Sequence, residues 1–310
     1  MYDIVGKRYY WFLLSLLVIV PGVFSLATHG LKLSIDFTGG TIWELQMSKA
    51  VPTDGVRAIL ADNGYGDSLI QTSSNNTLII RMKELNEGSA VKTKIMNQLE
   101  KQYGSVKELE LQSIGPSLGT QIANRALLAI LLASIGILIY IAYAFRNTQN
   151  PFLYGIAALI AMVHDVLVVV GIFSILGWVR GTEVDSLFVT AVLTVIGFSV
   201  HDTIVVFDRI RENLNRPGGR DYEETVNYSV LQTLVRSLNT SLTVIFTLAA
   251  LYLFGGDSTK DFVLALLIGI ASGTYSSIFN ASQVLVVWEN REVQHFWARV
   301  RGKRPRRSLA

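Results

Sequence analysis

The sequence predicts a membrane protein, a six-transmembrane-helix bundle with one extracytoplasmic ferredoxin-like α+β domain (βαββαβ). Half of the 310 residues are hydrophobic and only 16% are charged, whereas soluble globular chains carry about 25% charged residues. The apolar residues gather in blocks of roughly 20, the length that spans a bilayer. A polar segment between the first two blocks has its own alternating pattern and predicts the additional domain.

The apolar blocks predict six spans. They cover residues 9–27, 126–145, 152–177, 186–207, 238–254 and 262–288. The first block follows Lys7 and Arg8 and ends in Ser25-Leu26-Ala27, which resembles the cleavage site of a signal peptide. Because its apolar run is longer than the usual signal core, the prediction for this block is an uncleaved membrane helix.

The polar segment 28–125 reads as alternating strands and helices. Period-2 alternation predicts strands and helical spacing predicts helices, in the order strand 41–47, helix 53–63, strands 68–73 and 77–82, helix 89–103 and strand 106–114. This βαββαβ order predicts a four-stranded sheet with both helices on one face. The segment shows no catalytic constellation.

The basic residues predict the orientation. With the N-terminus inside, the inner segments hold Lys7, Arg8, Arg146, five arginines in 208–236 and seven basic residues after Trp288. The two short outer loops hold only Arg180 and Lys260. This positive-inside pattern predicts that both termini are cytoplasmic.

The expected organisation follows from these spans and this orientation. It comprises a first transmembrane helix over 1–27, a periplasmic ferredoxin-like domain over 28–125, a five-helix membrane region over 126–288 with a cytoplasmic loop at 208–236, and a basic cytoplasmic tail over 289–310. The tail is expected to be a topology anchor or a lipid-surface patch.

Composition also excludes several classes of chemistry. The absence of cysteine excludes disulfides, thiolate metal sites and cysteine nucleophiles. The four histidines, His29, His164, His201 and His295, do not have zinc-site spacing. The net charge of +3 is too weak to argue for nucleic acid. No metal, cofactor or nucleic-acid partner is therefore expected.

Three charged residues fall at membrane depth, where each costs about 2.5–3.5 kcal/mol on insertion scales. Asp165 lies in the third block, Asp202 in the fourth, and Arg236 where the fifth helix enters the membrane. A buried carboxylate beside an arginine can gain or lose a proton, so Asp202 and Arg236 are predicted to be proton-responsive, with an inert ion pair as the alternative. His201 either passes a proton to Asp202 or only donates a hydrogen bond. Asp165 has structural hydrogen bonding as its alternative role.

Polar and small residues repeat at helical spacing on three of the blocks. The repeats are Thr190, Thr194, Gly197 and His201; Arg236, Asn239, Thr240, Thr243 and Thr247; and Gly269, Gly273, Ser276, Asn280 and Gln283. Since polar groups facing lipid are wasteful, these stripes are predicted to converge inside the bundle, where they can also simply join helices. The Gly-x-x-x-Gly spacing in the last stripe predicts a close helix approach.

Several stretches resemble one family. They are Asp36-Phe-Thr-Gly-Gly40, Ile114-Gly-Pro-Ser-Leu-Gly119, His164-Asp165, the long run 196–213, and Arg236 followed by Ser237-Leu-Asn-Thr-Ser241. Together they resemble the SecD/SecF family of bacterial protein-export membrane proteins, which belongs to the resistance-nodulation-division superfamily of proton-driven transporters. The likeness covers nearly the whole chain.

The resemblance implies a function and a set of partners. It implies a subunit that pairs with SecD in a twelve-helix unit, works beside the SecYEG channel and YajC in the bacterial cytoplasmic (inner) membrane, and uses the proton motive force to draw preproteins outward. It implies that Asp202 is the proton-responsive aspartate, Arg236 its partner and Asp165 a further membrane acid. His201 stands where relatives often have asparagine.

Two glycine-containing motifs border the expected outer domain. Gly39 and Gly40 after Asp36 allow a sharp reversal that only glycine tolerates if φ is positive. Gly115-Pro116 supplies a rigid break before the second span. Both motifs are predicted to act as hinges.

Three other readings compete with a protein-export subunit. Asp165 and Asp202 would suit an intramembrane aspartyl protease that shares one proton between two acids, but Val200 and His201 stand where such proteases have Gly-x-Gly before the aspartate. A proton-driven small-molecule or lipid exporter of the same superfamily shares the aspartate. A passive assembly scaffold would not need Asp202.

Overall fold

The computed structural model describes residues 2–148, 150–216, 221–256, 259–292 and 294, so the basic tail at 299–307 lies outside the described residues. The chain divides into two compact units. The helical unit comprises residues up to 32, 129–182 and those from 187 onward, and the sheet unit comprises residues 33–128 and 183–186.

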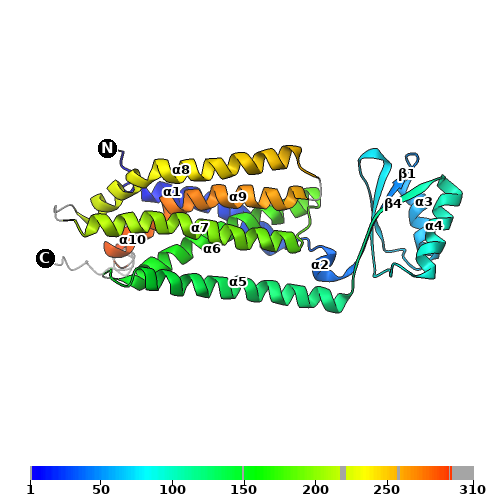
Figure 1. The fold of residues 1–310 in the computed structure, drawn as a ribbon, viewed down its shortest axis with the longest axis horizontal. Helices are drawn as coiled ribbons and strands as arrows, with labels where there is room; N and C mark the ends of the chain where they lie inside the picture. The colour runs from blue at the N-terminus through cyan, green and yellow to red at the C-terminus, as the bar shows by residue number, and fades with distance from the viewer. Residues whose placement is uncertain (1, 149, 217–220, 257–258, 293, 295–310) are drawn as a thin grey trace. The chain divides into compact units, whose positions relative to one another are not determined.

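Six helices are long and apolar enough to cross a membrane, which confirms the six predicted spans (Figure 1). They are α1 (Arg8–His29), α5 (Pro116–Ala144), α6 (Pro151–Arg180), α7 (Ser186–Leu214), α8 (Tyr222–Phe254) and a last span formed by α9 (Lys260–Ser276), the π turn η3 (Ser277–Ala281) and α10 (Ser282–Glu289). Helices α5 and α8 begin well before their apolar blocks because polar turns extend them. Asp221 is the N-cap of α8, and Glu223 and Glu224 in its first turn interact favourably with the helix dipole.

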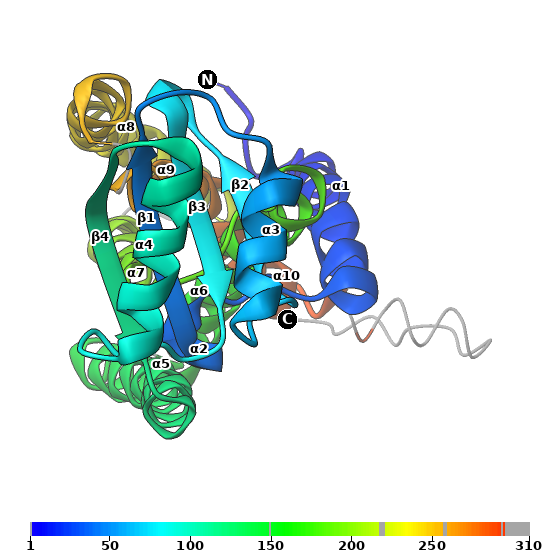
Figure 2. The same ribbon diagram turned by 90° about the vertical axis from the view of Figure 1, so that its right-hand side faces the viewer.

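The predicted βαββαβ order is confirmed. After the short helix α2 (Ile35–Thr38), the sheet unit runs β1 (Gly40–Met47), α3 (Thr53–Asp62), β2 (Leu69–Thr72), β3 (Thr77–Met82), α4 (Ala90–Tyr103) and β4 (Val106–Ile114). All neighbouring strands are antiparallel, in the order β2-β3-β1-β4. Figure 2 shows α3 and α4 on the same face of this sheet.

The core of the sheet unit lies between that sheet face and the two helices. Trp43, Leu45 and Met47 alternate inward along β1 and are almost fully buried. They pack with Leu60 of α3 and Leu99 of α4. Burying side chains of this size contributes roughly 1.5–3 kcal/mol each. This alternation is the signal from which β1 is predicted.

In the helical unit, α1 and α6 approach each other at a pair of glycines. A Cβ atom added to Gly22 would lie 2.8 Å from the Cα of Gly171. One turn away, the hydroxyls of Ser25 and Ser174 are 2.9 Å apart. Two glycines in register permit this contact because neither backbone is held away by a side chain.

A single amide ties the N-terminal residues to α8. The Oδ1 atom of Asn227 accepts hydrogen bonds from the backbone N–H groups of Ile4 and Val5, and its Nδ2 donates to the carbonyl of Tyr2. Ile4 and Val5 are buried. Asn227 therefore replaces three backbone partners that this non-helical segment would otherwise lack.

Candidate functional site

Asp202 lies on α7 and is 2% exposed. Its Oδ2 atom accepts a hydrogen bond of 3.2 Å from the hydroxyl of Ser241 on α8. The Ser241 oxygen in turn accepts a bond of 2.6 Å from Thr274 on α9. The carboxylate is thus held where three helices meet, with one side-chain donor among the described residues. That is a sparse shell for a buried acid.

Arg236 does not reach Asp202. It is exposed, and within the described residues it forms no ion pair with Asp202. The reason is helical geometry, because Arg236 precedes Ser241 by five residues and so points roughly 140° away from it at 3.6 residues per turn. The paired arrangement expected from the sequence is therefore absent from this structure of the single chain.

His201 is also not directed at Asp202. Its side chain is exposed on α7, and the described part of the chain contains no hydrogen bond between the two neighbours. Successive residues on a helix point about 100° apart, so the buried face that Asp202 occupies does not include His201.

Asp165 on α6 has a very different surrounding. It is fully buried, and its carboxylate accepts hydrogen bonds from His164 Nδ1 at 2.9 Å, Ser199 at 2.5 Å, Ser272 at 2.7 Å and Ser276 at 2.6 Å. Four donors from α6, α7 and α9 occupy both oxygens, which favours the structural alternative for this acid. In the described residues no hydrogen bond joins Asp165 to Asp202, so they do not form a shared-proton dyad.

The three polar stripes that were predicted to lie inside the bundle differ in their burial. The α9–α10 stripe is buried, and a Cβ atom on Gly273 would lie 3.1 Å from the Ser199 side chain, which confirms the predicted close approach. The stripes on α7 and α8 are exposed in this chain, so the prediction that they converge inside the bundle was wrong. Their threonines bond to their own helices, as Thr240 does to the carbonyl of Arg236 at 3.0 Å.

The buried polar face of α8 is a different row that the sequence reasoning missed. It consists of five hydroxyl residues four apart, Thr225, Ser229, Thr233, Ser237 and Ser241. We call these residues the hydroxyl row. The four-residue spacing is visible in the sequence, because residues four apart lie on adjoining turns of a helix, but it does not distinguish this row from the row through Arg236.

The family-like motif around Asp36 has a clear structural role. Asp36 Oδ2 accepts hydrogen bonds from the backbone N–H of Ser186 at 2.8 Å and from its hydroxyl at 2.5 Å. Ser186 is the first residue of α7. A carboxylate at a helix N-terminus satisfies an otherwise free donor and interacts favourably with the helix dipole.

The two glycines of this motif adopt the conformation that the sequence predicted. Gly39 has φ +73° and Gly40 φ +125°. A Cβ atom on Gly39 would lie 2.6 Å from the Cα of Pro116. Gly115 separates β4 from α5, with Pro116 as the first helical residue, so the predicted break is confirmed. The two motifs therefore pack against each other inside the sheet unit.

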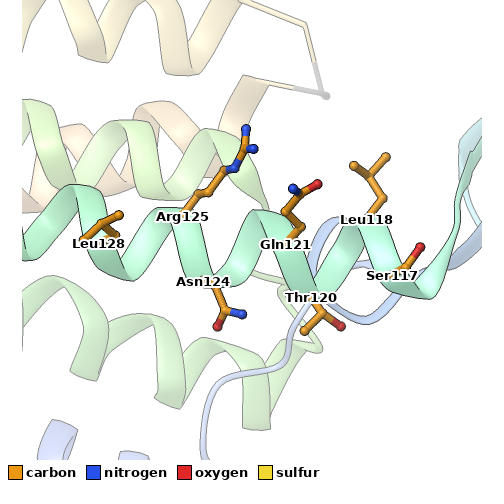
Figure 3. Close-up of a pocket in the computed structure, with 7 residues that line it drawn as sticks. All are labelled: Ser117, Leu118, Thr120, Gln121, Asn124, Arg125 and Leu128. Carbon is orange, nitrogen blue, oxygen red and sulfur yellow. The ribbon is translucent and has the colours of Figure 1, made fainter.

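A hollow lined by Thr38, Gly39, Arg81 and Glu183, among others, adjoins the glycine motif. A shallow depression runs along the first turns of α5 between Ser117 and Leu128, and Figure 3 shows its lining side chains leaving different sides of this single helix. The described residues also contain no group of three or more His, Asp or Glu placed to hold a metal ion.

The fold and the site together define a class of protein. The chain is a multi-pass membrane protein with one sheet domain and an acid buried between three of its spans. Residues 94–291 match the model of the protein export membrane protein SecD/SecF C-terminal family, and residues 24–51 match the SecD/SecF GG motif. The chain belongs to the SecD/SecF family of protein-export membrane proteins.

Similar proteins agree with this assignment. The chain is 56% identical over 309 residues to the protein translocase subunit SecF of Thermobaculum terrenum, covering 96% of this chain and 98% of that protein. It is 45% identical to SecF of Anaerolinea thermophila over 96% of this chain and 98% of that protein. The accessory-subunit function predicted from the family motifs is thereby supported, and a small-molecule or lipid exporter is not favoured.

Solved structures show the same architecture. The crystal structure of SecDF from Thermus thermophilus superposes with a TM-score of 0.81 at 32% identity over 94% of this chain. This chain spans 39% of the length of that SecDF chain. The Asp36–Gly40 motif described above lies within the part that matches the GG motif.

Proposed function

We propose that this chain works with SecD to couple the proton motive force to late steps of preprotein translocation across the bacterial cytoplasmic membrane. The observation that carries the proposal is Asp202, buried at the meeting point of α7, α8 and α9 with a single side-chain donor among the described residues. A buried acid that is not saturated by donors can respond to a proton, whereas Asp165 is held in a full shell.

The proposed coupling runs through the Ser241 hydroxyl. When Asp202 carries a proton it loses its negative charge, so the bond from Ser241 weakens and the Thr274–Ser241–Asp202 chain rearranges. This rearrangement can drive a conformational change only if the proton binds with different affinity to the two conformations of the helix bundle. A gradient of about 150–200 mV supplies roughly 3.5–4.6 kcal/mol per proton, enough to bias two packings of helices.

The exposed faces of α7 and α8 support SecD as the partner. His201, Arg236 and Asn239 lie on these faces and form no side-chain hydrogen bond within the described residues. Polar groups without partners are expensive against lipid. We therefore place SecD on this face, where an arginine or a histidine finds acceptors. Contacts with SecYEG, YajC and preproteins, and cytoplasmic termini, belong to the same proposal.

The outer domain is proposed to move with this rearrangement about the Gly39-Gly40 and Gly115-Pro116 motifs. A disulfide between cysteines that replace Thr38 and Ser117, two exposed residues beside the Gly39–Pro116 contact, would lock the motifs together without placing a Cβ atom on Gly39. Export is expected to fall when the disulfide forms and to recover on reduction. Export that is unchanged by the locked form would remove the hinge from the proposal.

The deciding experiment measures preprotein translocation in vesicles that contain the full chain with SecD, with and without a proton gradient. Asp202→Asn is expected to abolish the stimulation by the gradient while the complex still assembles. Asp208→Asn is the matched control, because Asp208 is a 58%-exposed carboxylate on the same helix, paired with Arg211. Stimulation that persists in Asp202→Asn would favour the passive scaffold.

A further inference from the structure

The hydroxyl row joins Asp202 to one end of the bundle. Its five members are at most 7% exposed, and residues four apart on a helix stand about 6 Å apart along it. The row begins with Thr225 in the first turn of α8 and ends with Ser241, which donates to Asp202. The charge pattern predicts that the Thr225 end is cytoplasmic.

Helix α7 lies antiparallel along this row. Its Asp202 meets Ser241, and its Asn213 donates to the Ser229 hydroxyl at 2.9 Å. One and two turns beyond Asp202, α7 contributes Val206 and Ile210, both fully buried. The α7 hydroxyl in this interval, that of Thr203, is used by the Ser199 carbonyl and the Ser277 hydroxyl, so the hydroxyls between the two polar contacts come from α8.

Three side chains on α7, α8 and α10 have buried polar atoms without partners in the described residues. They are the hydroxyl of Ser237, the Oδ1 of Asn213 and both amide atoms of Gln283 on α10, the helix that packs against α8. Ser237 is 2% and Gln283 0% exposed. An unpaired buried polar group costs about 1–3 kcal/mol, and buried water is the usual remedy where several such groups occur.

We propose that the hydroxyl row and the water it holds form the path by which a proton leaves Asp202 toward the Thr225 end of the bundle. This inference rests on the proposed function of Asp202. In the step, the O–H bond of the protonated carboxyl breaks, its electron pair stays on the carboxylate and the proton passes to a neighbouring water, leaving hydronium. The proton then moves along water molecules that the hydroxyls position, and ends in bulk water.

If the hydroxyl row served packing alone, the Ser237 hydroxyl would be expected to donate a hydrogen bond to a backbone carbonyl of its own helix. Thr233 donates to the backbone carbonyl of Ser229 at 3.1 Å, which leaves its own oxygen able to accept from water. Ser237, between Thr233 and Ser241, has no such bond. A buried serine with an unused hydroxyl is less stable than alanine in a helix. Ser237 is thus the residue at which the path and the packing explanations differ.

The test reconstitutes the full chain with SecD in vesicles that contain a trapped pH dye and measures gradient-driven proton flux together with translocation. Ser237→Val is expected to lower the flux at least about tenfold, since positioned proton transfer typically contributes about 100- to 10,000-fold. Ser237→Thr keeps the hydroxyl and is expected to stay within about twofold of the unmodified chain. Replacing H₂O by D₂O should slow the proton flux both in the unmodified chain and in Ser237→Thr.

The control and a second variant keep the result decisive. Ser134→Val is the matched control, because it removes a serine hydroxyl on α5 that bonds to the Ile130 carbonyl of its own helix at 2.8 Å, and it should leave the flux unchanged. If Ser237→Val fails to fold, Thr233→Val removes a hydroxyl of the row with almost no change of shape and takes its place.

The outcomes separate the two proposals. Unchanged flux in the folded Ser237→Val and Thr233→Val variants, combined with lost flux in Asp202→Asn, would overturn the path and leave the proposed function standing. Unchanged flux in Asp202→Asn would overturn both. Reduced flux in Ser237→Val with rescue by Ser237→Thr would support the path.

Discussion

Asp165 and Asp202 show how the number of donors decides what a buried acid does. Asp165 accepts four side-chain hydrogen bonds and joins α6, α7 and α9. Asp202 accepts one from Ser241. Both acids looked alike in the sequence, because each follows a histidine in an apolar run. Only the serines that reach Asp165 from other helices distinguish them.

Removing the Asp165 carboxylate should destabilise the bundle. Asp165→Ala leaves Ser199, Ser276 and other donors without an acceptor, at about 1–3 kcal/mol for each donor that finds no other partner. Asp165→Asn keeps one acceptor oxygen and should cost less. Denaturant unfolding of the purified chain in detergent checks the order. Equal stability of all three proteins would contradict the structural role.

Removing the Asp36 carboxylate should weaken the start of α7. Asp36→Ala loses the hydrogen bonds from Ser186, and lost caps typically cost about 0.5–2 kcal/mol. Asp36→Asn keeps an acceptor and serves as the control. Hydrogen–deuterium exchange of the first turn of α7 is expected to rise in the alanine variant alone.

Glu44 gives the sheet unit a pH dependence. Burial and the neighbouring Glu110 raise the pKa of Glu44, while Arg81 lowers it, and Glu44 faces Glu110 directly across β1 and β4. A folded-state pKa above the unfolded value penalises folding at neutral pH, and the penalty fades as pH falls through the folded pKa toward the ordinary glutamate value of 4.5.

Glu44→Gln should therefore stabilise the sheet unit at pH 7 by about 0.2–1 kcal/mol, the range for a cross-strand charge pair. The gain should shrink as the pH is lowered toward 4.5. Denaturant titrations followed by the fluorescence of buried Trp43, in a background without other tryptophans, provide the measurement. A gain that does not depend on pH would refute the electrostatic explanation.

At the scale of elements, the α1–α6 crossing depends on the absence of side chains. Gly171→Val places atoms where a Cβ would already lie 2.7 Å from the Cα of Gly22. Because the chain has no cysteine, cysteines replacing Ser25 and Ser174 give a clean report on this crossing. They are expected to form a disulfide readily in the parent and poorly with Gly171→Val. Gly136→Val, where a Cβ meets no described atom within 4 Å, is the control.

Most elements were predictable, but the faces of α8 were not. Apolar length defined the six spans and alternation defined β1, because both follow from local periodicity. On α8 two rows of polar residues run side by side, one through Arg236 and one through Ser237. Local sequence treats them as equal. Which row is buried depends on where Asp202 and Thr274 stand on other helices, and the single sequence does not contain that information.

At the scale of the whole molecule, one arginine gathers three distant segments. Arg8 of α1 pairs with Glu223 of α8 at 2.6 Å and with Glu292, after α10, at 2.5 Å. Burial raises the pKa of Glu292, but hydrogen bonds from Arg8, Tyr9 and Asn290 outweigh it and leave the pKa lowered. The positive-inside pattern identified Arg8 only as a residue that sets the membrane orientation. Its ion-pair partners could not be found in this way, because both are more than 200 residues away in the sequence.

The predicted topology can be tested on the same scale. In a chain without cysteine, Asn76→Cys in the outer domain and Asn215→Cys after α7 introduce single exposed thiols. An impermeant thiol reagent should label the first in intact spheroplasts and the second only after the membrane is opened. The reverse pattern would invert the positive-inside assignment.

The bond between Asn227 and the N-terminal segment has a consequence for how the protein is made. Asn227 is 223 residues beyond Ile4, and ribosomes add roughly 5–20 residues per second. The segment around Ile4 therefore waits roughly ten to forty seconds of synthesis for the amide that holds it. During that interval α1 is in the membrane before the Asn227 amide on α8 has been made. Residues 2–5 can therefore adopt their final hydrogen bonds only after the fifth span has been synthesised.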